Sequence, residues 1–204
     1  LGYNRACFRD GLSMPTLLYL HGFNSSPQSK KALQTQVWFS QHAPEIRFIC
    51  PLLSPFATVA MASLQAMIEQ SAEDPIYLVG SSMGGFFATC LIEQHNMRGV
   101  LINPAVSPGR GLQHWLGENV NSNTGEQWIF EPEHIAEYLA LDPEGLQRQN
   151  NYRVLLQRGD EVLDYRAAQK RYAGCSIVLE DGGDHSFVHY EQHLAAIHQF
   201  LISN

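Results

Sequence analysis

The stretch over residues 76–87 constrains this chain more than any other part of it. Its sequence, IYLVGSSMGGFF, takes four apolar, β-favouring residues directly into Gly-x-Ser-x-Gly and then into an apolar, helix-like segment. A serine on such a tight strand-to-helix turn has a strained backbone and is exposed at the carboxyl edge of a sheet. Ser82 is therefore the candidate nucleophile. The alternative is a glycine-rich turn in which Ser82 only caps the helix.

The order of the remaining apolar segments predicts an α/β fold. Six short segments have the composition of β-strands, and each is followed by a helical pattern or, in one case, by a long irregular stretch. This alternation implies one parallel sheet with helices on both faces. The predicted strands cover residues 16–20, 47–50, 76–79, 99–102, 154–157 and 176–179.

Two segments between these strands carry apolar residues at helical spacing, which we interpret as core positions. The first follows Pro27, a residue that suits the first turn of a helix. Its expected apolar stripe is Ala32, Leu33, Val37 and Trp38. The second helix should end near Pro75, with the stripe Val59, Ala60, Leu64, Met67 and Ile68.

A chain of 204 residues is long enough for one domain with a sizeable core and too short for two ordinary ones. We therefore predict a single domain over residues 1–204. Residues 104–151 interrupt the strand–helix alternation and are expected to form a small cap or lid over the catalytic edge, the alternative being an exposed loop. Residues 1–13 are expected to be a poorly ordered extension, with Met14 as a possible natural start.

The composition limits the classes of partner and the cellular compartment that we expect for this chain. The chain is 45% hydrophobic and 16% charged, which is typical of a globular protein. A net charge of −7 argues against nucleic acid and anionic membrane surfaces as partners, and no apolar run is long enough to span a bilayer. The four cysteines, which form no CxxC pair, are Cys7, Cys50, Cys90 and Cys175. Reduced core thiols in a cytoplasmic protein are the expected state.

A serine hydroxyl is a weak nucleophile that needs a base, and the base needs an acid to orient it. In α/β-hydrolases these residues follow in the chain order Ser, Asp or Glu, His. Ser82, Asp160 and His185 satisfy that order, and both partners follow predicted strands. Asp164 is the competing acid, although its position better suits a cap for a helix beginning at Tyr165.

The segment after the first strand, HGFNSSP, predicts the oxyanion hole. In this fold one backbone N–H comes from that loop and the other from the residue after the nucleophile, which indicates Phe23 and Met83. His21 is expected to support the loop rather than to transfer protons. Substrate contacts are expected from Asn24 in this loop and from two tryptophans of the insertion, Trp115 and Trp128.

Histidines at four-residue spacing raise a rival hypothesis, a metal site formed by His185, His189 and His193. The sequence contains no HExxH motif there, and His185 falls in a turn before the terminal helix. We therefore expect no metal and no cofactor, with His189 and His193 solvated or capping.

Taken together, five blocks give the chain a resemblance to the YqiA-like bacterial esterases from about residue 14 to its end. The blocks are HGFNSSP, GSSMGG, NPAV, GDEVLDY and the GGDH turn. Asp184 departs from the family, in which an uncharged Asn is common. The resemblance implies a small α/β-hydrolase fold with a minimal six-stranded sheet, in which Ser82, Asp160 and His185 match the family's triad positions.

The expected activity is hydrolysis of a small-molecule carboxylic ester or acyl thioester through an acyl-enzyme, without metal or cofactor. Two alternatives remain open at this point. One is a perhydrolase or C–C hydrolase with the same triad, and the other is a catalytically silent binding protein.

Overall fold

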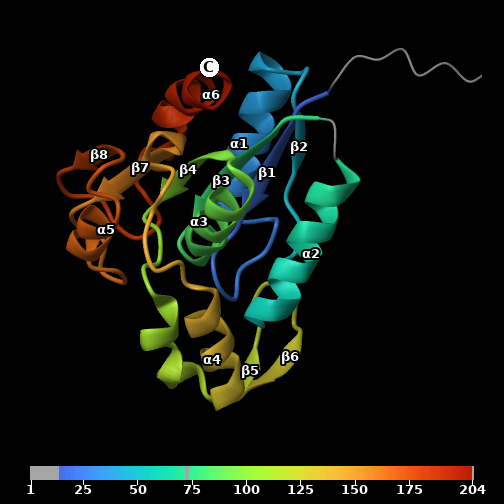
Figure 1. Cartoon of the computed structure of the whole chain (residues 1–204), viewed down its shortest axis with the longest axis vertical. Helices are drawn as coiled ribbons and strands as arrows, with labels where there is room; N and C mark the ends of the chain where they lie inside the picture. Colours follow the sequence, from blue (N-terminus) through green and yellow to red (C-terminus); the bar gives the residue numbers. More distant parts are fainter. Residues whose placement is uncertain (1–13, 72–73, 204) are drawn as a thin grey trace, which may run out of the picture.

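The computed structural model describes residues 14–71 and 74–203, and the expectation for residues 1–13 lies outside this part of the chain. Its centre is a six-stranded sheet in which all neighbouring strands are parallel (Figure 1). The strands are β1 (Thr16–Leu20), β2 (Arg47–Ile49), β3 (Ile76–Ser81), β4 (Arg98–Ile102), β7 (Tyr152–Gln157) and β8 (Ser176–Glu180). Each predicted strand is present, so the predicted α/β class and six-stranded sheet are confirmed.

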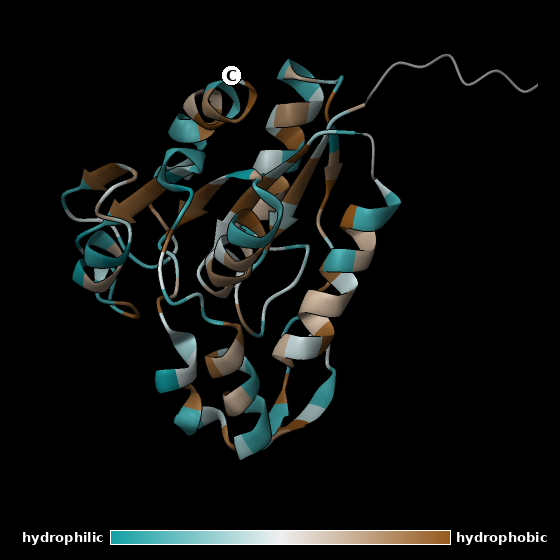
Figure 2. Cartoon of the chain, viewed as in Figure 1, coloured by the Kyte–Doolittle hydropathy of each residue, from teal (hydrophilic) through white to brown (hydrophobic). Residues whose placement is uncertain are grey.

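Helices cover both faces of this sheet and bury its side chains in two separate clusters. On one face lie α1 (Lys30–His42) and α6 (Leu194–Ile202), and on the other lie α2 (Ala57–Gln70), α3 (Met83–His95) and α5 (Tyr165–Arg171). Figure 2 shows hydrophobic strands enclosed between helices of mixed polarity. Leucine, valine and isoleucine side chains on β1, β3, β4 and β7 are buried, apart from the partly buried Ile76 at the start of β3, as expected for a parallel sheet covered on both faces.

The predicted start of α1 is wrong, and of its predicted stripe Ala32 and Trp38 pack in the core whereas Leu33 and Val37 are exposed. The helix begins at Lys30 rather than at Pro27, because Ser26 first forms a turn in which its Oγ accepts from the N–H of Gln28. Its buried face consists of Ala32, Thr35 and Phe39. Val37, expected in the core, is 55% exposed.

Most of the stripe predicted for α2 is confirmed: Ala60 and Leu64 are buried, and Met67 and Ile68 pack against the same core cluster. The buried residues are Ala57, Ala60, Met61 and Leu64, whereas Val59 is 55% exposed. The buried face of α1 is thus rotated away from Leu33 and Val37, whereas in α2 Val59 alone of the predicted residues points away from the core.

Strand order places a topological switch beside β1. The strand order is β2-β1-β3-β4-β7-β8. After β1 the chain forms β2 at the edge of the sheet, and it then crosses back to form β3 on the opposite side of β1. Leu20 at the end of β1 lies opposite Gly80 near the end of β3. Ligands in open α/β sheets bind in the crevice at such a switch. The loops after β1 and β3 therefore meet where a site is expected.

The insertion between β4 and β7, which we call the cap (residues 104–151), lies beyond the carboxyl ends of the strands (Figure 1). It contains two 3-10 turns (Pro108–Arg110 and Leu112–Trp115), an antiparallel hairpin of β5 (Gly117–Val120) and β6 (Gln127–Phe130), the helix α4 (Pro132–Leu141) and a third 3-10 turn (Gln149–Asn151). The hairpin has no counterpart in the sequence-based prediction, whereas α4 begins at Pro132 as its Glu-Pro start indicates.

Three cysteines within the described residues are free thiols. Cys90 is buried, whereas Cys50 and Cys175 are partly buried, and Cys7 lies outside the described part. Burial raises the pKa of Cys50 and Cys90 to about 12. Across residues 14–71 and 74–203, none of the helices combines the length and apolarity that crossing a bilayer would require.

Candidate active site

Ser82 occupies the turn between β3 and α3 with a backbone that non-glycine residues rarely adopt, φ 55° and ψ −119°. The turn is possible because Gly84 lies directly against the end of β1. A Cβ on Gly84 would collide with the carbonyl group of Leu20 and would come within 2.7 Å of the His21 oxygen. The carbonyl of Ser82 accepts from the amides of Gly85 and Ala105, at 2.9 and 3.0 Å, which fixes the strained residue.

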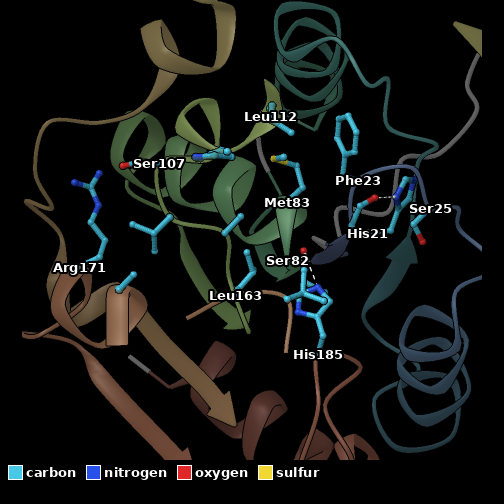
Figure 3. A pocket seen from close by; sticks show the side chains of 18 of the residues that line it. His21, Phe23, Ser25, Ser82, Met83, Ser107, Leu112, Leu163, Arg171 and His185 are labelled. Atoms are coloured by element: carbon cyan, nitrogen blue, oxygen red, sulfur yellow. Dashed lines mark hydrogen bonds between the residues drawn. The ribbon is translucent and has the colours of Figure 1, made fainter. Parts of the chain in front are cut away.

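His185 and Asp160 complete a chain of hydrogen bonds to Ser82. The Nε2 of His185 lies 3.1 Å from Ser82 Oγ, and its Nδ1 lies 2.9 and 3.0 Å from the two carboxylate oxygens of Asp160 (Figure 3 shows Ser82 and His185). A carboxylate can only accept, so Nδ1 carries the proton and Nε2 offers its lone pair to the serine hydroxyl. The structure thus brings together three residues separated by up to 103 positions.

Asp160 is held as a buried carboxylate, with its side chain only 2% exposed. Burial alone would raise its pKa. The hydrogen bonds from His185 and from the amides of Leu163 and Val162 outweigh that effect, so the pKa of Asp160 lies below its ordinary value. The competing acid, Asp164, instead caps α5 by accepting from the N–H of Arg166 at 3.0 Å.

Glu161 takes a position that the sequence did not indicate. Its Oε2 accepts from the backbone N–H of His185 at 3.0 Å. The carboxylate therefore helps to fix the turn that carries the imidazole.

Two buried amides behind His185 were also missed. The side chain of Asn103, at the end of β4, donates to the carbonyl of Asp184 at 3.1 Å and accepts from the N–H of Gln157 at 3.0 Å. The side chain of Gln157 donates to Val188 O at 2.8 Å and accepts from the amides of Asp184 and Val188. The histidine turn is thereby bonded to two core strands. The sequence signal that could have identified these two residues is a polar side chain at the carboxyl end of a buried strand.

The predicted oxyanion donors lie beside the candidate nucleophile. Phe23 and Met83 both line the same cavity as Ser82, and within the described residues neither backbone N–H has a protein acceptor. The oxyanion loop lies directly against the serine, since a Cβ on Gly22 would be in van der Waals contact with the Cβ of Ser82 at 3.5 Å. Met83 is also the first residue of α3, where the helix dipole favours negative charge.

His21 supports the oxyanion loop from behind. Its Nε2 accepts from the N–H of Leu53 at 3.0 Å, and its Nδ1 therefore carries the proton and donates to the carbonyl of Gly22 at 2.9 Å. Burial lowers the pKa of His21, so the ring is neutral near pH 7. With both nitrogens bonded, the side chain joins the loops after β1 and β2.

The cap holds the oxyanion loop from the other side. The ring of Phe23 packs edge-to-face against four cap rings, with centroids between 5.1 and 6.4 Å away: Trp115, Trp128, Phe130 and Tyr138. Next to it, the side chain of Asn24 donates to the carbonyl of Val120, at the end of β5. The side chain of Asn121 donates to Ser25 O at 3.1 Å. The cap and the loop therefore form one packed unit.

These contacts correct two of the predicted substrate contacts. Trp128 is 7% exposed and lies inside the aromatic cluster, and the Asn24 amide is bonded to the hairpin, so neither residue lines the cavity. Trp115 does line it. Aromatic residues of the insertion were expected in an acyl pocket, but most of them stabilise the cap itself.

The cavity in front of Ser82 has a volume of about 1420 Å³. Figure 3 shows the hydroxyl and imidazole facing it, with Phe23, Met83 and Leu112 on one side and Leu163 and Arg171 on the other. An apolar wall beside a nucleophile suits an acyl group.

The rival metal site is not assembled. Among the described residues, no group of three or more His, Cys, Asp and Glu side chains is arranged to hold a metal ion. His189 is solvated, as expected, with its side chain 69% exposed. The same expectation is wrong for His193, which is mostly buried and lies 2.9 Å from the Glu180 carboxylate.

Comparison with known proteins places this geometry in context. The model of a family described as uncharacterised, UPF0227, matches residues 16–202. A UPF0227 protein of Serratia proteamaculans is 27% identical over 190 residues, which cover 90% of this chain and 97% of that protein.

Solved structures share the architecture at lower sequence identity. A protein of Agrobacterium vitis S4, described provisionally as a hydrolase, superposes with a TM-score of 0.74 at 21% identity, over 92% of this chain and 88% of that one. Est1E of Butyrivibrio proteoclasticus with bound ferulic acid gives a TM-score of 0.71 at 14% identity, over 93% and 89%. Together with the strand order, these likenesses establish the α/β-hydrolase fold.

Proposed function

The chain belongs to the UPF0227 family, and we propose that this member is a serine hydrolase that cleaves carboxylic esters or acyl thioesters through an acyl-enzyme. One observation carries the proposal: His185 Nε2 lies 3.1 Å from Ser82 Oγ while its Nδ1 is bonded to buried Asp160. A nucleophile, a base and an orienting acid in hydrogen-bonding reach are what acyl transfer requires.

In the first half of the reaction, Ser82 Oγ attacks the acyl carbonyl and His185 Nε2 takes its proton. Asp160 holds the imidazole in the correct tautomer and stabilises the imidazolium. The amides of Phe23 and Met83 donate to the developing oxyanion, a contribution of about 3 kcal/mol per donor in comparable sites. His185 then protonates the leaving alkoxide or thiolate.

In the second half, water replaces the leaving group. His185 removes a proton from the water as it attacks the acyl-enzyme, and the collapse of the second tetrahedral intermediate returns a proton to Ser82. The product is a carboxylic acid. Est1E holds such an acid, ferulic acid, and this supports the proposal by analogy of fold alone.

The experiment is a series of nitrophenyl esters and acyl thioesters of increasing chain length, measured on the wild type and on Ser82→Ala. Hydrolysis by the wild type and none by Ser82→Ala is the expected result. Inactivity on every ester and thioester, together with turnover of diketones or formation of peracids, would overturn the proposal in favour of the C–C hydrolase or perhydrolase. Inactivity in all of these assays would favour the binding protein.

Two aspartates at the same loop provide a matched pair. Asp160→Asn should lower kcat by about 10⁴-fold, because an amide at this position stabilises the wrong imidazole tautomer. Asp164→Asn should keep kcat near that of the wild type, since Asp164 caps α5 and has no contact with His185. The reverse ranking would assign the acid to Asp164.

A further inference from the structure

The cavity beside Ser82 is basic although the chain is acidic. The formal net charge of the protein is −7, with 20 carboxylates against 13 Lys and Arg residues. Among the residues that the structure describes, two carboxylates line the cavity, Glu144 and Glu161. Five cationic side chains line it: Lys30, Lys31, Arg110, Lys170 and Arg171. The bias in this cavity is therefore opposite to that of the whole chain.

Some of these charges are already engaged within the protein. Lys31 donates to the carbonyl of Ser186 at 2.8 Å, next to the histidine turn. Arg171 pairs with Asp142 at 3.2 Å and also donates to the carbonyl of Pro143. Glu161, one of the two acidic residues, is bonded to the amide of His185.

Arg110 and Lys170 differ from Lys31 and Arg171 in this respect. Both are exposed, and within the described residues neither side chain has a carboxylate closer than 4.0 Å or a hydrogen-bond partner. They come from different elements: Arg110 ends the first 3-10 turn of the cap, and Lys170 lies in the last turn of α5. The helix dipole favours a basic residue at a helix C-terminus, which explains the position of Lys170 at the end of α5. It does not explain the position of Arg110.

Arg171 lies apart from the reacting atoms. Figure 3 shows Arg171 across the cavity from Phe23, with Leu163 between Arg171 and Ser82. A substrate that reaches from the serine to these cations passes an apolar wall first. It would thus combine an ester, an apolar stretch and a terminal charge.

We propose that Arg110, Lys170 and Arg171 form a subsite for an anionic group, a carboxylate or a phosphate, carried by the substrate at the end remote from the scissile bond. The inference rests on the proposed hydrolase function and deepens it by naming a substrate class. Arg171, fixed by Asp142, supplies the ordered part of the subsite, and the unpaired Arg110 and Lys170 supply its uncompensated charge.

The test compares ester pairs that differ only in charge. One pair is a nitrophenyl monoester of a long dicarboxylic acid and its neutral methyl ester, and the other is an acyl ester whose alcohol bears a phosphate and its dimethylated analogue. At low salt we expect kcat/KM to be about 10-fold higher for the anionic ester than for the neutral ester in at least one pair. At high salt the kcat/KM of the anionic ester should fall toward that of the neutral ester, because exposed charges are screened. If one of the two pairs shows the preference and the other does not, the pair that shows it identifies the anion as a carboxylate or a phosphate.

Charge-removing variants locate the effect. The double variant Arg110→Gln, Lys170→Gln should reduce the anionic-to-neutral ratio toward 1. Arg166→Gln removes a positive charge from the same helix, outside the cavity lining, and should keep the wild-type ratio. An equal rate for charged and neutral esters, or a ratio unchanged in the double variant, would overturn the subsite.

Failure of the subsite and failure of the hydrolase proposal remain distinguishable. Equal turnover of both esters refutes only the subsite. If no ester is turned over, binding of the matching non-hydrolysable amides to the wild type and the double variant, measured by calorimetry, still decides the subsite. Tighter binding of the anionic amide that is lost in the double variant supports it, and equal binding contradicts it.

Discussion

Asn121 links the cap to the oxyanion loop, and its truncation tests whether the cap positions that loop. The side chain is 6% exposed, donates to Ser25 O at 3.1 Å and accepts from the amides of Asn123 and Thr124. Asn121→Ala removes three hydrogen bonds of roughly 1 kcal/mol each. The free energy of unfolding should therefore fall by about 2–3 kcal/mol.

The effect on catalysis follows from what still holds the loop. Complete loss of one oxyanion donor costs about 3 kcal/mol. In Asn121→Ala the Phe23 ring keeps its aromatic contacts and Asn24 keeps its bond to Val120, so about half of that loss is expected. This corresponds to a kcat about 10-fold lower. KM should stay unchanged, because Asn121 does not line the cavity.

The assay is steady-state ester hydrolysis together with denaturant unfolding, and Asn119→Ala is the matched control. The amide of Asn119 bonds only within the cap, to the carbonyls of Trp115 and Gly117. It should lose stability but keep kcat. If Asn121→Ala lost stability and kept the wild-type kcat, the cap would not position the oxyanion loop.

Three further predictions concern packing, reactivity and pH. Gly84→Ala should lower the free energy of unfolding by more than about 3 kcal/mol, because its Cβ would collide with the backbone of Leu20, whereas the Cβ of Gly111→Ala would make only an ordinary contact with the Pro108 carbonyl oxygen at 3.8 Å and the variant should be nearly neutral in denaturant melts. Burial lowers the pKa of Lys31 to about 8, so at pH 8 mass spectrometry should find it acetylated faster than the exposed Lys30; equal rates would contradict this. The pKa of Asp160 is lowered in the folded state, so its contribution to stability is present above its unfolded pKa and is lost as the pH falls through the folded value. Between pH 5 and pH 3 the wild type should therefore lose more stability than Asp160→Asn, and equal losses would contradict the assigned shift.

The local sequence was enough to predict those parts of the structure that local backbone geometry determines. The turn around Ser82 follows from apolar residues, glycines and a serine in a fixed order, and the parallel sheet follows from six buried segments. The choice of Asp160 over Asp164 for contact with His185 was also available locally, because the spacing of Asp164 suits an N-cap and the structure places it there.

What the sequence did not provide depends on contacts between distant segments. The β5–β6 hairpin was missed because its strands have four residues each and their sequences do not alternate: β5 is mostly exposed, and in β6 the exposed position between Trp128 and Phe130 is held by an apolar residue, Ile129. Trp128 was assigned to the substrate because aromatic content alone cannot distinguish a pocket wall from the core of a cap. Asn103 contacts a turn about eighty positions away, a relation that no local pattern contains.

The central claim is that Ser82 is a nucleophile activated by His185, and covalent labelling tests it most directly. The intact protein would be treated with an alkyl fluorophosphonate and analysed by mass spectrometry, beside Ser82→Ala and His185→Ala. We predict one phosphonate per chain on Ser82, no labelling of Ser82→Ala, and labelling slowed by several orders of magnitude in His185→Ala. An unlabelled wild type, or a label on any other residue, would contradict the account.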